Sequence, residues 1–205
     1  MITPQAVVFD LGKVLVDFDY SIAARRIAAR GKMTILEIAK FINTSPLFFA
    51  YESGRVTTRQ FFDEICEITG FRGDLAEFSG CFADIFTEIA PMVQMQAELQ
   101  LRGMPAYAFS NTNELAIAHI QQNFTFYTQF TGCILSYEHG AMKPDARLYE
   151  VVERQSGRRG AEILYLDDRP ENIAAGAERG WQVILHESPE LSRAAVQKLG
   201  LLSRA

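Results

Sequence analysis

Acidic side chains end two apolar segments of the chain. The run AVVF, residues 6–9, is followed by Asp10, and the run ILYL, residues 163–166, is followed by the pair Asp167 and Asp168. A buried carboxylate without a partner is costly. Carboxylates held close together also repel one another, which raises their pKa values. A hard cation relieves both effects, and Mg²⁺ favours a few carboxylates together with waters and a phosphate.

Other polar residues follow two further apolar runs. AYAF, residues 106–109, leads into Ser110 and Asn111, and Lys143 comes shortly after the weaker run GCILS, residues 132–136. The carboxyl ends of parallel strands share one edge of a sheet, where open α/β folds bind their ligands. We therefore expect carboxylates, a hydroxyl, an amide and an ammonium group to converge at one edge.

Short apolar runs alternate with amphipathic stretches along most of the chain. The runs, with QVIL at 182–185 as another, are too short for helices and rich in Val, Ile, Leu and aromatic residues, which predicts buried strands. The stretches at 91–103, 144–157 and 170–180 open with Pro and close with Gly, which predicts helices. This alternation predicts a Rossmann-like, doubly wound α/β core with a mostly parallel sheet.

One region interrupts the alternation. Residues from about 20 to 89 contain four helical stretches and no convincing strand, and Thr57 or Thr58 could cap the third helix. We expect an α/β core formed by residues 1–17 and 90–205, with residues 18–89 inserted as a helical unit.

The bulk properties limit the partners. The chain has 205 residues, 48% of them hydrophobic, and a formal charge of −5, which gives no basic surface for nucleic acid. It has neither a signal-peptide pattern nor an apolar run of about 18 residues, so we expect no membrane span. Three cysteines without paired spacing predict no zinc site or disulfide framework. We expect a cytoplasmic protein, a monomer or a homodimer.

Four motifs occur in a fixed order: FDLGKVLVD (9–17), FSNTN (109–113), KPD (143–145) and LYLDDRPENI (164–173). With them, the chain resembles the haloacid dehalogenase-like hydrolase superfamily, in the phosphatase branch with a helical C1-type cap. The likeness covers almost the whole chain, and YESGRVTTRQFFDEI (51–65) resembles the cap of this branch. The resemblance implies a magnesium-dependent phosphatase of a small phosphorylated metabolite.

The resemblance also implies a metal site and a nucleophile. Asp10 would attack phosphorus and form an aspartyl-phosphate intermediate. Mg²⁺ would be held by Asp10, by the backbone carbonyl of Gly12 and by Asp168, with Asp167 acting behind them or through water. These roles fit phosphoryl transfer, in which catalysis is mostly positioning and charge stabilisation.

Substrate-binding residues follow from the same resemblance. Ser110 and the backbone N–H of Asn111 would hold a phosphoryl oxygen, and Lys143 would offset the charge of the transferring phosphoryl group. In the cap, Arg55 could meet a second anionic group and Tyr51 could hydrogen-bond a hydroxyl of the substrate.

The first motif departs from the usual pattern at Gly12. Phosphatases of this superfamily usually carry an Asp there, which protonates the leaving oxygen and later activates water, and a Gly where this chain has Lys13. A substrate with a good leaving group, such as a sugar 1-phosphate or an acyl phosphate, would need that acid less. Asp17, Asp19 or a cap residue could partly replace it.

The sequence also permits two other hypotheses about function. A metal-independent haloacid dehalogenase also lacks the second Asp, but it would have no use for Asp167 and Asp168 beside the nucleophile. A catalytically weak member could bind a phosphorylated ligand as a sensor.

Overall fold

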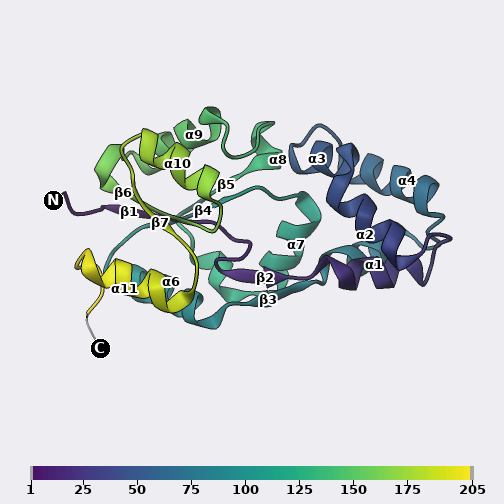
Figure 1. Cartoon of the computed structure of the whole chain (residues 1–205), viewed down its shortest axis with the longest axis horizontal. Coiled ribbons are helices and arrows are strands. Elements are labelled where there is room, and N and C mark those ends of the chain that lie inside the picture. The colour runs from purple at the N-terminus through teal and green to yellow at the C-terminus, as the bar shows by residue number, and fades with distance from the viewer. Residues whose placement is uncertain (1, 204–205) are drawn as a thin grey trace.

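A five-stranded sheet occupies the centre of the larger part of the molecule (Figure 1). The structure, a computed structural model, describes residues 2–203. The strand order is β5-β4-β1-β6-β7, and every neighbouring pair is parallel. The strands are β1 (Ala6–Phe9), β4 (Ala106–Ser110), β5 (Gly132–Leu135), β6 (Ile163–Asp167) and β7 (Gln182–Leu185). The predicted α/β class and the five apolar strands are confirmed.

Helices cover both faces of this sheet. One face packs against α6 (Ala90–Leu101), α7 (Glu114–Asn123) and α11 (Pro189–Lys198). The other packs against α9 (Ala146–Ser156) and α10 (Pro170–Glu178), which lie above the sheet in Figure 1. Because both faces are covered, all four residues of β1 are buried, which is why the strand is a continuous apolar run and not an alternating one.

Short elements join these helices to the sheet. α8 (Ser136–His139) follows β5, and the 3₁₀ turns η1 (Thr125–Gln129) and η2 (Gly160–Glu162) precede β5 and β6. The helix expected to open at Pro144 begins instead at Ala146. The side chain of Asp145 accepts a hydrogen bond from the backbone N–H of Arg147 and caps that helix.

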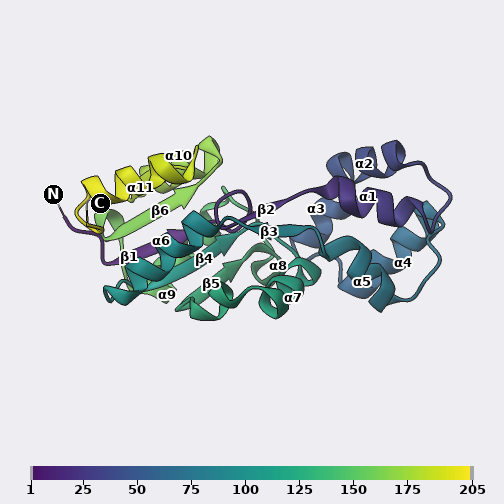
Figure 2. The same ribbon diagram turned by 90° about the horizontal axis from the view of Figure 1, so that it is seen from below.

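A second, all-helical part lies between β1 and β4 in sequence. Its helices are α1 (Tyr20–Ala28), α2 (Ile35–Thr44), α3 (Pro46–Glu52), α4 (Thr58–Thr69) and α5 (Leu75–Ala83). They enclose a hydrophobic core of their own, separate from the two cores that flank the sheet. Figure 2 shows this part set apart from the sheet. Within residues 2–203, no helix combines the length and apolar character needed to cross a membrane.

The two segments that connect the parts are strands. β2 (Val16–Phe18) and β3 (Phe86–Glu88) pair antiparallel, with Val16 opposite Glu88. The expectation of no strand between residues 20 and 89 is therefore wrong at β3, where the sequence read as the end of a helix. A three-residue strand carries almost no periodic signal, and its partner lies about 70 residues away in the chain.

Hydrogen bonds also tie α3 to the sheet-bearing part. The hydroxyl of Ser136 donates to the carbonyl of Glu52 (2.6 Å), and the hydroxyl of Tyr51 accepts from the N–H of Leu115 (3.2 Å). Thr58, at the start of α4, hydrogen-bonds the carboxylate of Glu114. These contacts hold α3 close to the carboxyl ends of the strands.

The helical part is expected to depend on its aromatic core. The ring of Phe78 is fully buried and contacts those of Phe61, Phe62, Phe71 and Phe82. Phe78→Ala leaves a cavity there and is expected to lower the free energy of unfolding by about 3–5 kcal/mol, as measured by urea denaturation. Phe49→Ala, at a ring that is 54% exposed, is the control, with an expected change under about 1 kcal/mol. Equal losses in the two variants would contradict this account of the helical core.

Candidate active site

Asp10 lies where the central strand of the sheet ends. Its N–H donates to the carbonyl of Leu166 on β6 (2.9 Å), which continues the parallel ladder one residue beyond β1. Its carboxylate accepts the N–H of Leu11 (2.7 Å) and is only 7% exposed. The backbone therefore fixes the carboxylate at the sheet edge with little freedom to turn away.

Two more carboxylates come from the neighbouring strand. Phe9 pairs with Leu166, so Asp10 and Asp167 are adjacent at the strand ends, and Asp168 follows directly. One carboxylate oxygen from each of Asp10, Asp167 and Asp168 lies within 4.8 Å of the others. Parallel register alone thus produces the cluster that the sequence predicted.

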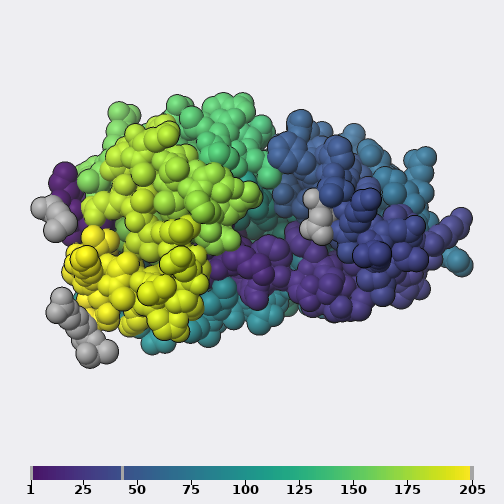
Figure 3. Space-filling view, in the orientation of Figure 1, coloured from purple at the N-terminus to yellow at the C-terminus, as the bar shows by residue number. Residues whose placement is uncertain are grey.

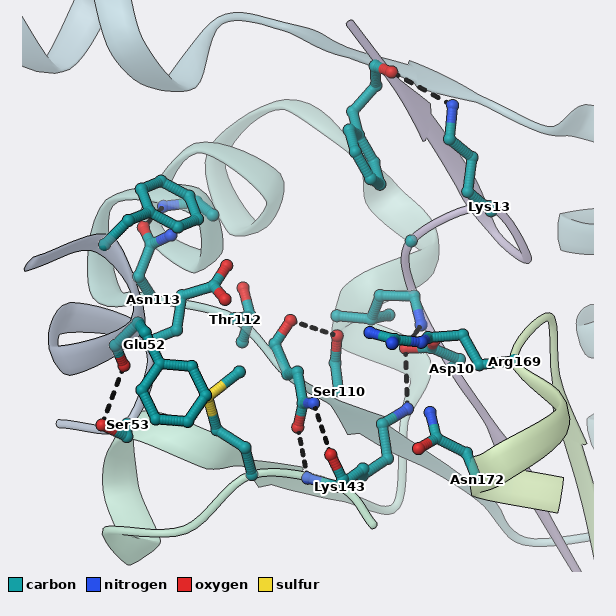
Figure 4. Close-up of a pocket in the computed structure, with 18 of the residues that line it drawn as sticks. Asp10, Lys13, Glu52, Ser53, Ser110, Thr112, Asn113, Lys143, Arg169 and Asn172 are labelled. Carbon is teal, nitrogen blue, oxygen red and sulfur yellow. Dashed lines mark hydrogen bonds and ion pairs between the residues drawn. The ribbon is translucent and has the colours of Figure 1, made fainter. Parts of the chain in front are cut away.

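The ammonium group of Lys143 lies against this cluster. It donates to Asp167 Oδ2 (2.6 Å) and to the carbonyl of Phe109 (2.8 Å), and it lies 3.2 Å from Asp10 Oδ1. The side chain is 1% exposed and its ammonium lies over the rings of Phe109 and Tyr165. A buried cation therefore joins the two carboxylates, and Figure 4 shows its contact with Asp10.

Asn111 positions Lys143 through the backbone. Its Oδ1 accepts the N–H of Lys143 (2.7 Å), and its Nδ2 donates to the carbonyl of the same residue (3.0 Å). Ser110, the last residue of β4, is 4% exposed and lines the cavity beside Asp10. The sequence indicated a role for the backbone of Asn111 and missed this side-chain contact, which no local pattern encodes.

Asp167 is held by hydrogen bonds on both oxygens. Oδ1 accepts the N–H of Arg169 (2.8 Å) and the side-chain amide of Asn172 (3.0 Å), and Oδ2 accepts the hydroxyl of Tyr165 besides the ammonium of Lys143. Sequence reasoning assigned no role to Tyr165. Its place two residues before Asp167 on one strand put both side chains on the same face, which was the available signal.

The electrostatics of the cluster favour a cation. Burial raises the pKa of Asp10 to about 7, although Lys143 opposes the shift. Burial also raises the pKa of Asp168, with the charge of Asp167 as the next cause. For Asp167, burial works in the raising direction, but Lys143 and the hydrogen bonds hold its pKa below the ordinary value. One ammonium does not balance three carboxylates, so these oxygen donors fit a divalent cation.

Gly12 is crowded by an aromatic ring. A Cβ atom on Gly12 would lie 2.9 Å from Cε1 of Phe18. Lys13, which has a φ of 60°, lies apart from the carboxylates (Figure 4): its ammonium donates to the carbonyl of Phe18 (3.2 Å), pairs with Asp17 and lies over the Phe18 ring. The position two residues after Asp10 therefore has no room for a side chain while Phe18 stays in place.

A cavity of about 980 Å³ opens over these residues, between the sheet edge and the helical part. Figure 3 shows a hollow there, above the N-terminal segment that joins the two parts. Asp10, Gly12, Ser110, Lys143 and Asp168 line its polar end. Its apolar wall includes Phe18, Tyr20, Ile42, Phe48, Phe49 and Phe86.

The two residues predicted from the helical part, Tyr51 on α3 and Arg55 just after it, differ in where they lie. Arg55 is exposed and lines the cavity, where its Nε donates to the hydroxyl of Ser53 (2.8 Å). The prediction that Tyr51 hydrogen-bonds a substrate hydroxyl is wrong. Its side chain is 2% exposed and lies outside the cavity lining, stacked on Phe61. Its hydroxyl is engaged with Thr58 and Leu115, so it holds the helical part and does not face a ligand.

Glu52 is a cavity residue that the sequence reasoning missed. It lies on α3 and points into the cavity, toward the Thr112 side of the polar end (Figure 4). Burial raises its pKa to about 7, with Arg169 opposing the shift. The available signal was its spacing: it follows Phe48 and Phe49 by four and three residues, which places all three on one side of the helix.

Comparisons with known proteins agree with this geometry. The family model for haloacid dehalogenase-like hydrolases matches residues 4–180. A sesquiterpene phosphatase, astK, from Aspergillus oryzae is 24% identical over 93% of both chains. A D-ribitol-5-phosphate phosphatase from Bacteroides thetaiotaomicron is 24% identical over 89% of this chain and 91% of its own.

The fold also recurs among solved structures. One is a HAD family enzyme, bt-2542 of Bacteroides thetaiotaomicron, in complex with magnesium and inorganic phosphate. It is 23% identical and superposes with a TM-score of 0.77 over 88% of this chain and 93% of its own.

The buried ammonium is expected to be essential for the stability of the site. Lys143→Met leaves Asp10 and Asp167 without their counterion and is expected to lower the free energy of unfolding by about 3–5 kcal/mol at pH 7, measured by urea denaturation. Because Lys143 lowers the pKa of Asp167, the ion pair stabilises the folded state at neutral pH, and this stabilisation is lost once acid protonates Asp167. The stability difference between the wild type and Lys143→Met should therefore narrow as the pH falls through and below the ordinary Asp value of 3.8.

Lys13→Met provides the matched control, since its ion pair with Asp17 is solvent-exposed. An exposed pair contributes less than about 1 kcal/mol, and little change is expected. Similar losses in the two lysine variants, or a Lys143→Met deficit that does not vary with pH, would contradict the proposed electrostatics.

Proposed function

Because the chain belongs to the haloacid dehalogenase-like hydrolases, we propose that it hydrolyses a phosphate monoester of a small metabolite with the help of Mg²⁺. The observation that carries this proposal is the meeting of three carboxylates and one buried ammonium at a single sheet edge. Two relatives that are phosphatases, and a solved relative that holds magnesium and phosphate, support it.

Asp10 is the proposed nucleophile. Its carboxylate oxygen attacks phosphorus, the bond to the leaving oxygen breaks, and an aspartyl-phosphate results, which water then hydrolyses. Asp10, Asp168 and the carbonyl of Gly12 would hold Mg²⁺, with Asp167 behind them, and the ion would supply positive charge to the phosphoryl oxygens. The hydrogen bonds on both oxygens of Asp167 suit this supporting role, because they leave it less free to bind an ion directly.

Ser110, Asn111 and Lys143 complete the phosphate site in this proposal. The hydroxyl of Ser110 and the backbone N–H of Asn111 bind a phosphoryl oxygen. The ammonium of Lys143 lies 3.2 Å from Asp10 and 2.6 Å from Asp167, so it offsets the repulsion between these two carboxylates. It also stabilises the negative charge of the transferring phosphoryl group. The side chain of Asn111 fixes the backbone of Lys143, so both groups keep their place as substrate enters.

The leaving group lies on the side of the helical part. We propose that residues 18–89 form a cap on a core of residues 1–17 and 90–205, and that the cap excludes water and contacts the leaving group. Arg55, at the cavity wall, would meet a second anionic group of the substrate. Residue 12 offers no proton donor, which favours a sugar 1-phosphate or another phosphate with a good leaving group.

The acidic cluster disfavours the alternative of a metal-independent dehalogenase. That reaction needs a nucleophile but no cation, whereas three carboxylate oxygens within 4.8 Å are costly without one. A sensor with little turnover would share the same site, and measured phosphate release distinguishes it from an enzyme.

Asp10→Asn is expected to abolish phosphate release from sugar 1-phosphates and acyl phosphates, measured with Mg²⁺ and again after chelation. The wild type should lose its activity on chelation. Because Asp10 is buried and its pKa is raised to about 7, removal of its charge should not lower the metal-free stability at pH 8. Wild-type turnover by this variant would rule out Asp10 as nucleophile, and absence of turnover in the wild type would favour the sensor.

The missing acid can be tested by restoring it. Gly12→Asp alone is expected to raise kcat on an alkyl phosphate only slightly, because the new Cβ would lie 2.9 Å from the ring of Phe18. Gly12→Asp combined with Phe18→Leu makes room and should raise kcat on an alkyl phosphate by about 10-fold or more over Phe18→Leu alone, as general acid catalysis allows. The measurement is a rate comparison of the four variants on one alkyl phosphate. An equal gain with and without the Phe18 change would show that this ring is not the obstacle.

A further inference from the structure

A carboxyl group on the cap faces the same cavity as the nucleophile. Glu52, the last residue of α3, points into the space that Asp10 and Ser110 line from the other side (Figure 4). Among the side chains that the structure describes, none hydrogen-bonds its carboxyl, although its backbone carbonyl accepts from Ser136 (2.6 Å). That backbone contact fixes the end of the helix and leaves the side chain available to a ligand.

The other carboxyl groups near the cavity are already in use. Asp10 and Asp168 belong to the acidic cluster. Asp145 caps α9 and forms an ion pair with Arg147. Asp17 and Asp19 lie outside the cavity lining: Asp17 pairs with Lys13, and Asp19 caps α1. Of the described carboxyls that line the cavity, Glu52 is the one without such a role.

Few charges reach Glu52 from the elements around it. Arg169, in the loop after β6, is the charged group that favours its ionised form. Tyr20 on α1 lines the same cavity and faces Glu52: burial, and after it the charge of Glu52, raises the pKa of its phenol. The other titratable groups on neighbouring elements have partners of their own: Glu114 on α7 with Thr58, Glu138 on α8 with Tyr137, Arg59 on α4 with Asp63, and Arg55 with Ser53. Arg169 itself pairs with Glu171, so none of the described residues is a dedicated counterion of Glu52.

We propose that Glu52 is the general acid and base of this site, supplied by the cap in place of the residue missing at position 12. The inference rests on the proposed phosphatase function. In the first step Asp10 attacks phosphorus, the phosphorus–oxygen bond to the leaving group breaks, and the leaving oxygen takes the proton from the Glu52 carboxyl. In the second step the Glu52 carboxylate takes a proton from the attacking water, and the phosphorus–oxygen bond to Asp10 breaks. Phosphate leaves, and both carboxyl groups return to their starting states.

Two properties of the chain agree with this role. Burial raises the pKa of Glu52 to about 7, so near neutral pH both its acidic and its basic form are populated. The donor comes from the cap, so it meets the leaving group and not the phosphoryl oxygens. The anomeric oxygen of a sugar 1-phosphate needs a proton less than an alkoxide does when it leaves, but it is far more basic than a nitrophenolate, so this donor would serve a sugar 1-phosphate much more than a nitrophenyl phosphate.

The test compares two leaving groups in Glu52→Gln, which keeps the size of the side chain but has no proton to transfer. With Mg²⁺, kcat on glucose 1-phosphate is expected to fall about 100-fold, while kcat on p-nitrophenyl phosphate changes by less than about 3-fold. Glu67→Gln, at an exposed cap carboxyl on α4, is the matched control and should leave both rates unchanged. Urea denaturation of each variant reports on the fold.

The pH profile separates proton transfer from simple positioning. Wild-type kcat on glucose 1-phosphate should fall as the pH rises above about 7, because the carboxyl loses its proton, and Glu52→Gln should lack this descending limb. Equal losses on both substrates, or an unchanged descending limb in Glu52→Gln, would overturn the role of Glu52 and leave Asp10 as nucleophile. If the wild type released phosphate from neither substrate, the proposed function would fall, and this inference with it.

Discussion

The site depends on the repulsion among carboxylates that parallel register brings together. Asp10 follows β1, Asp167 ends the adjacent strand β6, and Asp168 comes directly after it. The strand register therefore brings the three carboxylates close together. The ammonium of Lys143 offsets part of this charge from within the protein, and Asn111 keeps it in place. The remaining negative charge is what makes the sheet edge suited to a cation and, beside it, to a phosphate.

The helical part acts on this centre through two contacts of different kinds. On one side Phe18, in the connecting strand β2, fills the space next to Gly12 and is itself covered by Lys13. On the other side α3 brings Glu52 to the cavity and is fixed by its bond with Ser136. The packing that leaves no room for a side chain at Gly12 thus accompanies a carboxyl that enters the cavity from the opposite wall.

Much of this could be predicted from local sequence. Buried strands in a covered sheet are continuous apolar runs, and a charged residue at the end of such a run is conspicuous, as at Asp10 and Asp167. Helix limits were also readable where Pro opens and Gly closes a stretch, although Asp145 and not Pro144 sets the start of α9. The strands β2 and β3 were missed because they are only three residues long and pair with each other across the whole helical insert.

The sequence by itself determined which residues have the chemistry and at which strand ends they stand, because an apolar run and the polar residue that ends it are local features of the chain. Only the tertiary structure decided which side chains face the cavity. Tyr51 and Glu52 are neighbours in sequence, yet Tyr51 stacks on Phe61 inside the helical part and Glu52 lines the cavity. Their directions follow from how α3 packs against α4 and α8, and such packing depends on contacts between distant segments that no local pattern records.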